Sequence, residues 1–187
     1  MNRKFGRLLL IGWLSLIFSG YAFVAAAAEL KVGDKVSNLQ FSGPLTTKAQ
    51  QYLGLAGPGK FSLMDVQGQY LLIEVFSTIC PHYQIQAPAM NQLYRLVSQN
   101  PKLAGSLKII GLGYYEQAPA LVRYQQKFQV PFPLIPDEKA VVSDALNVPG
   151  TPTVVVLDKT GRVVYFHVSE FHDAKKFLRD LLAHLNL

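Results

Sequence analysis

The sequence predicts an α/β fold in which helices cover a central mixed β-sheet. Two apolar stretches, residues 71–76 and 107–113, have the composition of buried strands, and each precedes a stretch with helical spacing of apolar residues. A strand pair over residues 154–168 and an amphipathic helix follow near the C-terminal end. Strands that alternate with helices and end in an antiparallel hairpin are typical of a sheet sandwiched between helices.

Residues 1–28 are typical of a bacterial export signal. Basic residues at positions 3, 4 and 7 precede an uncharged apolar run, and Ala26 and Ala28 form a small-x-small cleavage site. We therefore expect cleavage after Ala28 and a periplasmic location. Residues 8–28 are also long enough to cross a bilayer, so an uncleaved anchor in the inner membrane is the alternative.

The composition of the remaining chain indicates a single domain and excludes some kinds of partner and cross-link. Removing residues 1–28 leaves about 160 residues, which suits one domain with a sizeable core. Three of the six net positive charges belong to the signal, and the other basic residues are scattered among acids. This distribution does not resemble a nucleic-acid-binding surface, so no nucleic-acid partner is expected. Because Cys80 is the only cysteine, the chain cannot form an internal disulfide.

The first half of the domain centres on one buried strand. Residues 29–60 are rich in Gly, Pro, Gln and Thr and predict an irregular lead-in with a short strand at 39–41; residues 61–187 form the main domain. Residues 61–70 predict a strand and hairpin. Residues 71–76 are apolar except for Glu74, which indicates a central strand, and a helix over residues 81–100 follows, with Pro81 in its first turn.

The second half supplies the rest of the sheet and three helices. The pattern predicts a strand at 107–113, helices at 119–128 and 138–146, strands at 154–157 and 163–168, and a last helix at 171–185. The two final strands are joined by a turn that contains Gly161, as in a hairpin. Pro131-Phe132-Pro133 is interpreted as a surface edge or partner groove, with core packing as the alternative.

Cys80 lies where the central strand gives way to the helix, in Phe76-Ser-Thr-Ile-Cys-Pro-His-Tyr83. At a helix N-terminus, unpaired N–H groups and the positive end of the helix dipole favour the thiolate, which is the reactive form of cysteine. A protonated His82 would add a cation nearby. The alternative is that Cys80 is a small buried apolar residue without chemistry.

Three motifs together resemble the thioredoxin superfamily, in particular its exported TlpA-like and redoxin branch. They are Phe61-x-Leu-x-Asp-x-x-Gly68, the Cys80 segment and Val148-Pro-Gly-Thr-Pro-Thr153, and the resemblance covers about residues 33–186. It implies a thioredoxin-like fold with an N-terminal extension and a TlpA-like insertion. It further implies that Cys80 is the attacking cysteine, that Pro152 is a cis-proline beside it, and that the Thr151 backbone pairs with a partner peptide.

Two further positions agree with this family. Glu74 lies six residues before Cys80, where thioredoxins carry a buried acid, and Pro88 lies eight residues after it, where their helix is kinked. Burial would raise the pKa of Glu74 and let it move protons beneath the site. The alternative for Glu74 is a strand-end acid that faces solvent or pairs with a lysine. For Thr151-Pro152, the alternative is an ordinary trans turn.

Tyr83 departs from the family pattern, because it stands where a second cysteine would complete C-x-x-C. A lone thiol must find its partner sulfur on another molecule, so mixed-disulfide exchange with protein or small-molecule thiols is the expected chemistry. We expect Cys80, Glu74 and His82 to act in catalysis, and Thr151, Pro152, Tyr83 and Pro81 to contact the partner.

Two other functions stay open. The chain could be a redox-inactive binding module that keeps the fold, or a one-cysteine peroxidase of the peroxiredoxin type. For the peroxidase, Ser77 fits P-x-x-x-[T/S]-x-x-C, but Ile73 stands at the proline position. Cys80 with His82, His167 or His172 could supply a few metal ligands, but solvated or capping histidines are favoured, and we expect neither a metal nor a cofactor.

Overall fold

A computed structural model of the chain describes residues 30–37 and 39–187. The predicted signal, residues 1–28, and the alternative anchor, residues 8–28, lie outside the described residues. Within the described part, no helix combines the length and the apolar character needed to cross a membrane.

The molecule is built on a five-stranded mixed sheet with the order β5-β4-β3-β6-β7. The central strand β3 (Tyr70–Phe76) pairs parallel to β4 (Leu107–Tyr114) and antiparallel to β6 (Thr153–Asp158). The edges are β5 (Leu134–Asp137), parallel to β4, and β7 (Val163–Val168), antiparallel to β6. Every residue of β3 is buried, as its apolar sequence predicts, and the expected α/β class with a mixed sheet is confirmed.

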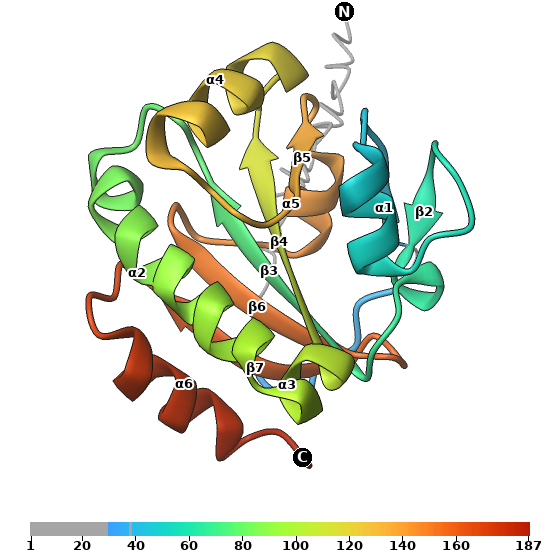
Figure 1. The fold of residues 1–187 in the computed structure, drawn as a ribbon, viewed down its shortest axis with the longest axis vertical. Coiled ribbons are helices and arrows are strands. Elements are labelled where there is room, and N and C mark those ends of the chain that lie inside the picture. Colours follow the sequence, from blue (N-terminus) through green and yellow to red (C-terminus); the bar gives the residue numbers. More distant parts are fainter. Residues whose placement is uncertain (1–29, 38) are drawn as a thin grey trace, which may run out of the picture.

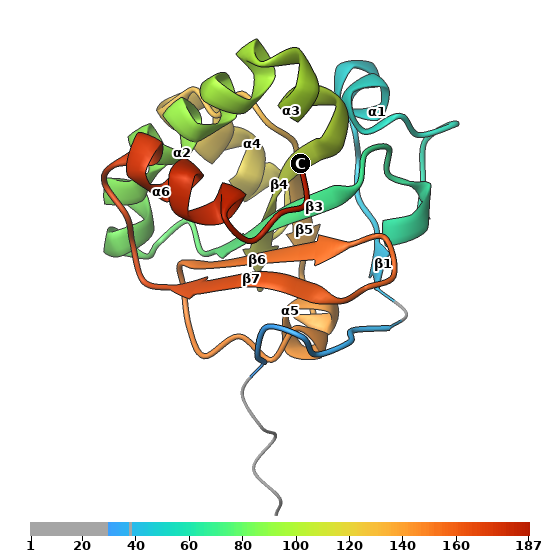
Figure 2. The same ribbon diagram turned by 90° about the horizontal axis from the view of Figure 1, so that it is seen from below.

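Helices cover both faces of this sheet (Figure 2). On one face lie α2 (Pro81–Gln99), α3 (Pro101–Ser106), α4 (Ala118–Phe128) and α6 (Ala174–Leu182). Figure 1 shows α2 and α6 side by side. The opposite face is covered by α5 (Val141–Ala145) and by the N-terminal segment. Each face has its own apolar core, so β3 contributes alternate side chains to both.

The lead-in is more ordered than its composition predicts. It contains β1 (Gln40–Phe41) and a helix, α1 (Thr47–Leu53), which the sequence analysis missed. The Thr46 hydroxyl accepts a hydrogen bond from the Ala49 N–H at the start of α1, and Gly54 ends the helix in a left-handed conformation. Phe41 and Leu53 are fully buried, so this extension completes the core on the α5 face.

Two further expectations are wrong in detail. The hairpin expected over residues 61–70 is instead β2 (Phe61–Ser62), which pairs with β1, followed by a 3-10 helix at Leu63–Asp65. The Asp65 carboxylate accepts hydrogen bonds from the Ser62 N–H and hydroxyl, which fixes this turn. The strand β5 was not expected either; with α4 it is inserted between β4 and α5 and extends the sheet. Phe132, just before β5, is buried as the core-packing alternative expects, while Pro131 is partly exposed and residues 131–133 also line a cavity of about 170 Å³.

Candidate active site

Cys80 lies next to the loop before β6, at the end of the sheet where β3 ends and β6 begins. Because β6 runs antiparallel to β3, the start of β6 lies beside the end of β3, with Thr153 opposite Val75. Cys80 is the N-cap residue of α2, and its thiol Sγ donates a hydrogen bond to the Thr151 carbonyl oxygen over 3.3 Å. The Thr151–Pro152 peptide bond is cis. Residues separated by 71 positions in the sequence are therefore brought together at the thiol.

Glu74 lies beneath the site on β3 and is completely buried. Its carboxylate oxygens accept hydrogen bonds from the Gln86 amide (2.6 Å) and the Tyr83 hydroxyl (3.2 Å). Burial raises the pKa of Glu74 from 4.5 to about 8, although these two hydrogen bonds oppose the change. The acid therefore carries its proton at neutral pH and can release it slightly above neutral pH.

Tyr83 points inward from the first turn of α2. Its side chain has 0 % exposure, and its ring lies 4.2 Å from that of Phe76 and 5.2 Å from that of Tyr124, measured between centroids. Its hydroxyl donates to Glu74. The expectation that Tyr83 contacts a partner is corrected by this burial: the phenol fills the space between the helix and the sheet and offers no surface at the site.

Gln86 connects Glu74 with the C-terminal part of the chain. While its amide N–H donates to Glu74, its carbonyl oxygen accepts a hydrogen bond from the Phe171 N–H over 3.0 Å. Both polar ends of this buried side chain are thereby satisfied. The sequence analysis missed Gln86; its place one turn after Tyr83, on the same helix face, is the signal that could have found it.

Glu116 holds the loop that leads to Cys80. Its Oε1 atom accepts hydrogen bonds from the Thr78 N–H (2.6 Å), the Thr78 hydroxyl (2.8 Å) and the Ser77 hydroxyl (3.1 Å). Gly113 makes room for it, because a Cβ atom there would lie 2.8 Å from Glu116 Cβ. This residue was also missed. Since β3 and β4 are parallel, an acid just beyond β4 lies at the same sheet edge as Cys80, which could have identified it.

His82 and Pro81 lie on the exposed side of the first turn of α2. His82 is 64 % exposed, and its Nδ1 atom lies 3.2 Å from the Glu170 carboxylate. A hydrogen bond from the Glu170 backbone N–H and the contact with His82 lower the pKa of Glu170. His82, Thr151, Pro152 and Glu170 are among the residues around a cavity of about 190 Å³. The imidazole expected to tune the thiol thus has a carboxylate partner at the rim of this cavity.

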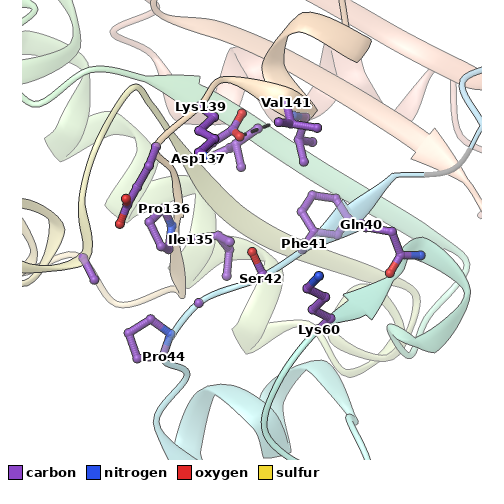
Figure 3. Close-up of a pocket in the computed structure, with 15 residues that line it drawn as sticks. Gln40, Phe41, Ser42, Pro44, Lys60, Ile135, Pro136, Asp137, Lys139 and Val141 are labelled. Carbon is purple, nitrogen blue, oxygen red and sulfur yellow. Dashed lines mark hydrogen bonds between the residues drawn. The ribbon is translucent and has the colours of Figure 1, made fainter.

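A separate cavity of about 560 Å³ lies on the α5 face of the sheet, between the N-terminal segment and β5 (Figure 3). Phe41, Ile135 and Lys60 are among its lining residues, and none of the predicted site residues borders it. The other histidines considered as metal ligands are His167, on β7 among aromatic rings, and the exposed His172. Among residues 30–37 and 39–187, no three His, Cys, Asp or Glu side chains are grouped as metal ligands.

The sequence was compared with models of known protein families. The model of the AhpC/TSA family matches residues 32–166, which includes β1 and both halves of the site. The chain belongs to the AhpC/TSA family. Its similarity to thiol-disulfide oxidoreductases places this AhpC/TSA protein in the thioredoxin superfamily, on the TlpA-like branch.

The curated proteins and solved structures that resemble this AhpC/TSA protein include several thiol-disulfide oxidoreductases. Thiol-disulfide oxidoreductase ResA of Geobacillus kaustophilus is 26 % identical over 101 residues, 54 % of this chain and 55 % of ResA, so the match spans little more than half of that relative. Thiol:disulfide interchange protein DsbE of Escherichia coli K12 is 25 % identical over 177 residues, 92 % of this chain and 89 % of DsbE. A putative DsbE from Chlorobium tepidum has a TM-score of 0.64 at 20 % identity, covering 83 % of this chain and 99 % of that structure, and thus shares the thioredoxin-like fold.

Proposed function

We propose that this AhpC/TSA protein is an exported monothiol that exchanges disulfides with protein or small-molecule thiols through Cys80. The observation that carries the proposal is the position of Cys80: it is the N-cap residue of α2, and its Sγ lies 3.3 Å from the Thr151 carbonyl oxygen, next to the cis peptide bond at Pro152. Unpaired N–H groups at a helix N-terminus stabilise negative charge on a sulfur placed there. The similarity to thiol-disulfide oxidoreductases supports the same chemistry.

The exchange needs only one cysteine in its first step. The Cys80 thiolate attacks one sulfur of a partner disulfide, a new S–S bond forms, the old one breaks, and the leaving thiolate takes a proton from water. With no second cysteine in the sequence, an external thiolate must attack the mixed disulfide to release Cys80. Export follows in this proposal from the signal at residues 1–28.

Two neighbouring groups would assist. Glu74, with a pKa of about 8, can both take up and release a proton near neutral pH, which suits a proton reserve beneath the thiol. The Thr151–Pro152 segment would align the backbone of an extended partner at the sulfur. His82, which lines the cavity beside Thr151, and the exposed Pro81 would border the partner on the α2 side.

Alkylation kinetics test the proposal. We expect purified mature protein, residues 29–187, to react with iodoacetamide at neutral pH faster than free cysteine does. Incubation with a low-molecular-weight disulfide should add one thiol mass to the protein and none to the Cys80→Ala variant. Alkylation no faster than that of free cysteine, together with no adduct, would contradict the proposal.

A redox-inactive binding module is the second candidate, favoured by the inward position of Tyr83, which leaves no group to resolve a mixed disulfide. An intact mass of protein taken from its own compartment without reductant distinguishes the two. A bound thiol or partner on Cys80 supports exchange, whereas a free thiol that reacts slowly supports the binding module. Peroxide consumption that depends on Cys80 and an external thiol would favour a one-cysteine peroxidase.

A further inference from the structure

A second small cavity borders the Cys80 loop on the side opposite His82. It has a volume of about 180 Å³ and lies between that loop, the first turns of α2 and one face of α4. Thr78 and Gln84 form its wall next to the thiol, and Arg123, Lys127 and Phe128 form the wall on α4. Its volume is below that of a typical ligand pocket, but it can hold a single functional group of a partner.

The wall next to the thiol is held in place. Thr78 precedes Cys80 by two residues, which puts the two Cα atoms within about 7 Å of each other. The Gln84 amide donates to the Thr78 carbonyl over 2.9 Å, and Glu116 accepts from the Thr78 N–H and hydroxyl. The loop that carries Cys80 therefore supplies one wall of the cavity at a fixed position, although Cys80 itself is not among the lining residues.

The opposite wall is positively charged. Arg123 and Lys127 are four residues apart on α4, so they share one face of the helix. Both are exposed, and neither forms an ion pair with any residue that the structure describes; Lys127 Nζ lies 4.8 Å from the centroid of the Phe128 ring. No acidic residue lines the cavity. Two like charges at this spacing repel each other, and a bound anion relieves that repulsion.

The two carboxylates bound near the Cys80 segment, Glu116 and Glu170, lie outside the cavity lining and have other partners. Glu116 is only 9 % exposed, and its Oε1 atom is already shared by three donors of the Cys80 loop. Glu170 lies on the other side of α2, paired with His82. The surface around Cys80 is therefore asymmetric, with a paired imidazole and carboxylate on one side and two unpaired cations on the other.

We infer that the cavity between the Cys80 loop and α4 binds a carboxylate of the exchange partner, so that Cys80 prefers disulfides that carry an acidic group close to the sulfur. This inference rests on the proposed exchange function and names its substrate class. The carboxylate would contact Arg123 and Lys127 while the partner sulfur faces Cys80, and the bonds made and broken are those of the exchange step described above.

Charge-matched reagents test the inference. Iodoacetate and iodoacetamide alkylate the same thiol, but only iodoacetate is an anion. Likewise, oxidised glutathione is an anionic disulfide, and bis(2-hydroxyethyl) disulfide is a neutral one. In the Arg123→Gln/Lys127→Gln variant, the rate constants for the two anionic reagents should fall about 3- to 10-fold, and those for the neutral reagents should change less than about 2-fold. Raising the salt concentration to 1 M should remove most of the wild-type preference.

The matched control is Lys35→Gln/Lys102→Gln, which removes the same charge at the end of the sheet opposite Cys80. Lys102 lies in α3, just before the start of β4, and the backbone of Lys35 forms an antiparallel β-bridge with that of Arg162, in the turn between β6 and β7. This control should keep the ratio of anionic to neutral rates.

An unchanged ratio in Arg123→Gln/Lys127→Gln, or an equal fall in the control, would overturn the inference and leave the proposed function intact. Failure of every disulfide to react would instead refute the exchange function. The iodoacetate to iodoacetamide ratio would still show whether the two cations act on an anion at Cys80. A disulfide-linked peptide with aspartate next to cysteine, compared with oxidised glutathione, tells an acidic protein segment from a small thiol as the source of the carboxylate.

Discussion

Replacing Glu74 with Gln should remove most of the pH dependence of stability above pH 5. The folded-state pKa of Glu74 is about 8, against 4.5 for the free side chain. Between these values the folded protein keeps a proton that the unfolded chain has lost. The contribution of Glu74 to the free energy of unfolding is therefore fully present below pH 4.5 and is lost as the pH rises towards 8.

The magnitude follows from this difference. At about 1.36 kcal/mol for each pH unit, the loss of stability is up to about 5 kcal/mol over the whole interval and roughly 2 to 3 kcal/mol between pH 5 and pH 7. A Gln side chain resembles the protonated acid: its oxygen can accept from Gln86, and the Tyr83 hydroxyl can turn to accept from its N–H. Its charge does not change with pH, so the slope from this site disappears.

Urea unfolding at pH 5, 7 and 9, followed by far-UV circular dichroism, measures this effect. Both proteins carry the Cys80→Ala substitution, so that they differ only at residue 74. We expect the parent protein to lose stability with rising pH and the Glu74→Gln variant to lose at least about 2 kcal/mol less between pH 5 and 7. Equal slopes in the two proteins would refute the reasoning, because Glu74 would then titrate alike in the folded and unfolded states.

Three more substitutions probe the same region. Each is measured by urea unfolding at pH 6, and Tyr83→Phe also at pH 5, 7 and 9. Tyr83→Phe removes the hydroxyl that donates to Glu74 and should cost about 1 kcal/mol while raising the pKa of Glu74 further; an unchanged stability-versus-pH curve would contradict this. Tyr83→Cys opens a cavity beside Phe76 and Tyr124 and should cost about 3 kcal/mol, and a loss below 1 kcal/mol would show that the neighbours close the space. Glu116→Ala leaves three donors of the Cys80 loop without an acceptor and should cost about 2 kcal/mol, with Glu116→Gln costing less than half as much because its amide oxygen still accepts; equal losses would argue against the hydrogen bonds.

The sequence predicted the secondary structure best where a strong local signal marks an element. The apolar run of β3, the Pro81 start of α2 and the Gly161 turn between β6 and β7 all have strong local signals, and these elements lie where they were expected. In contrast, α1 has seven residues and buries only Leu53, so no apolar periodicity marks it. The strand β5 has four residues and contains Pro136, which argues against a strand unless the strand is at an edge, as this one is.

Some features of the candidate site could likewise be expected from the sequence, and others could not. The position of Cys80 beside Thr151 was expected from the motifs, and the burial of Glu74 from the apolar strand around it. The end of the sheet at which Glu116 lies could have been inferred from the parallel pairing of β3 and β4, but its contact with the Cys80 loop depends on the backbone turning back at Tyr115, which has a φ of 54°. The direction of the Tyr83 side chain depends on which face of α2 lies on the sheet, and an aromatic residue in the first turn is compatible with either direction.

The inward direction of Tyr83 has an evolutionary consequence. A tyrosine codon becomes a cysteine codon by one base change, so the two-cysteine motif is genetically close to this sequence. Structurally it is further away, because the rings of Phe76, Tyr124 and Phe128 form a continuous stack that includes Tyr83. A cysteine at position 83 would leave much of this volume empty, so the cost of a two-cysteine motif in this chain depends on how far the rings of Phe76 and Tyr124 can move to fill the space.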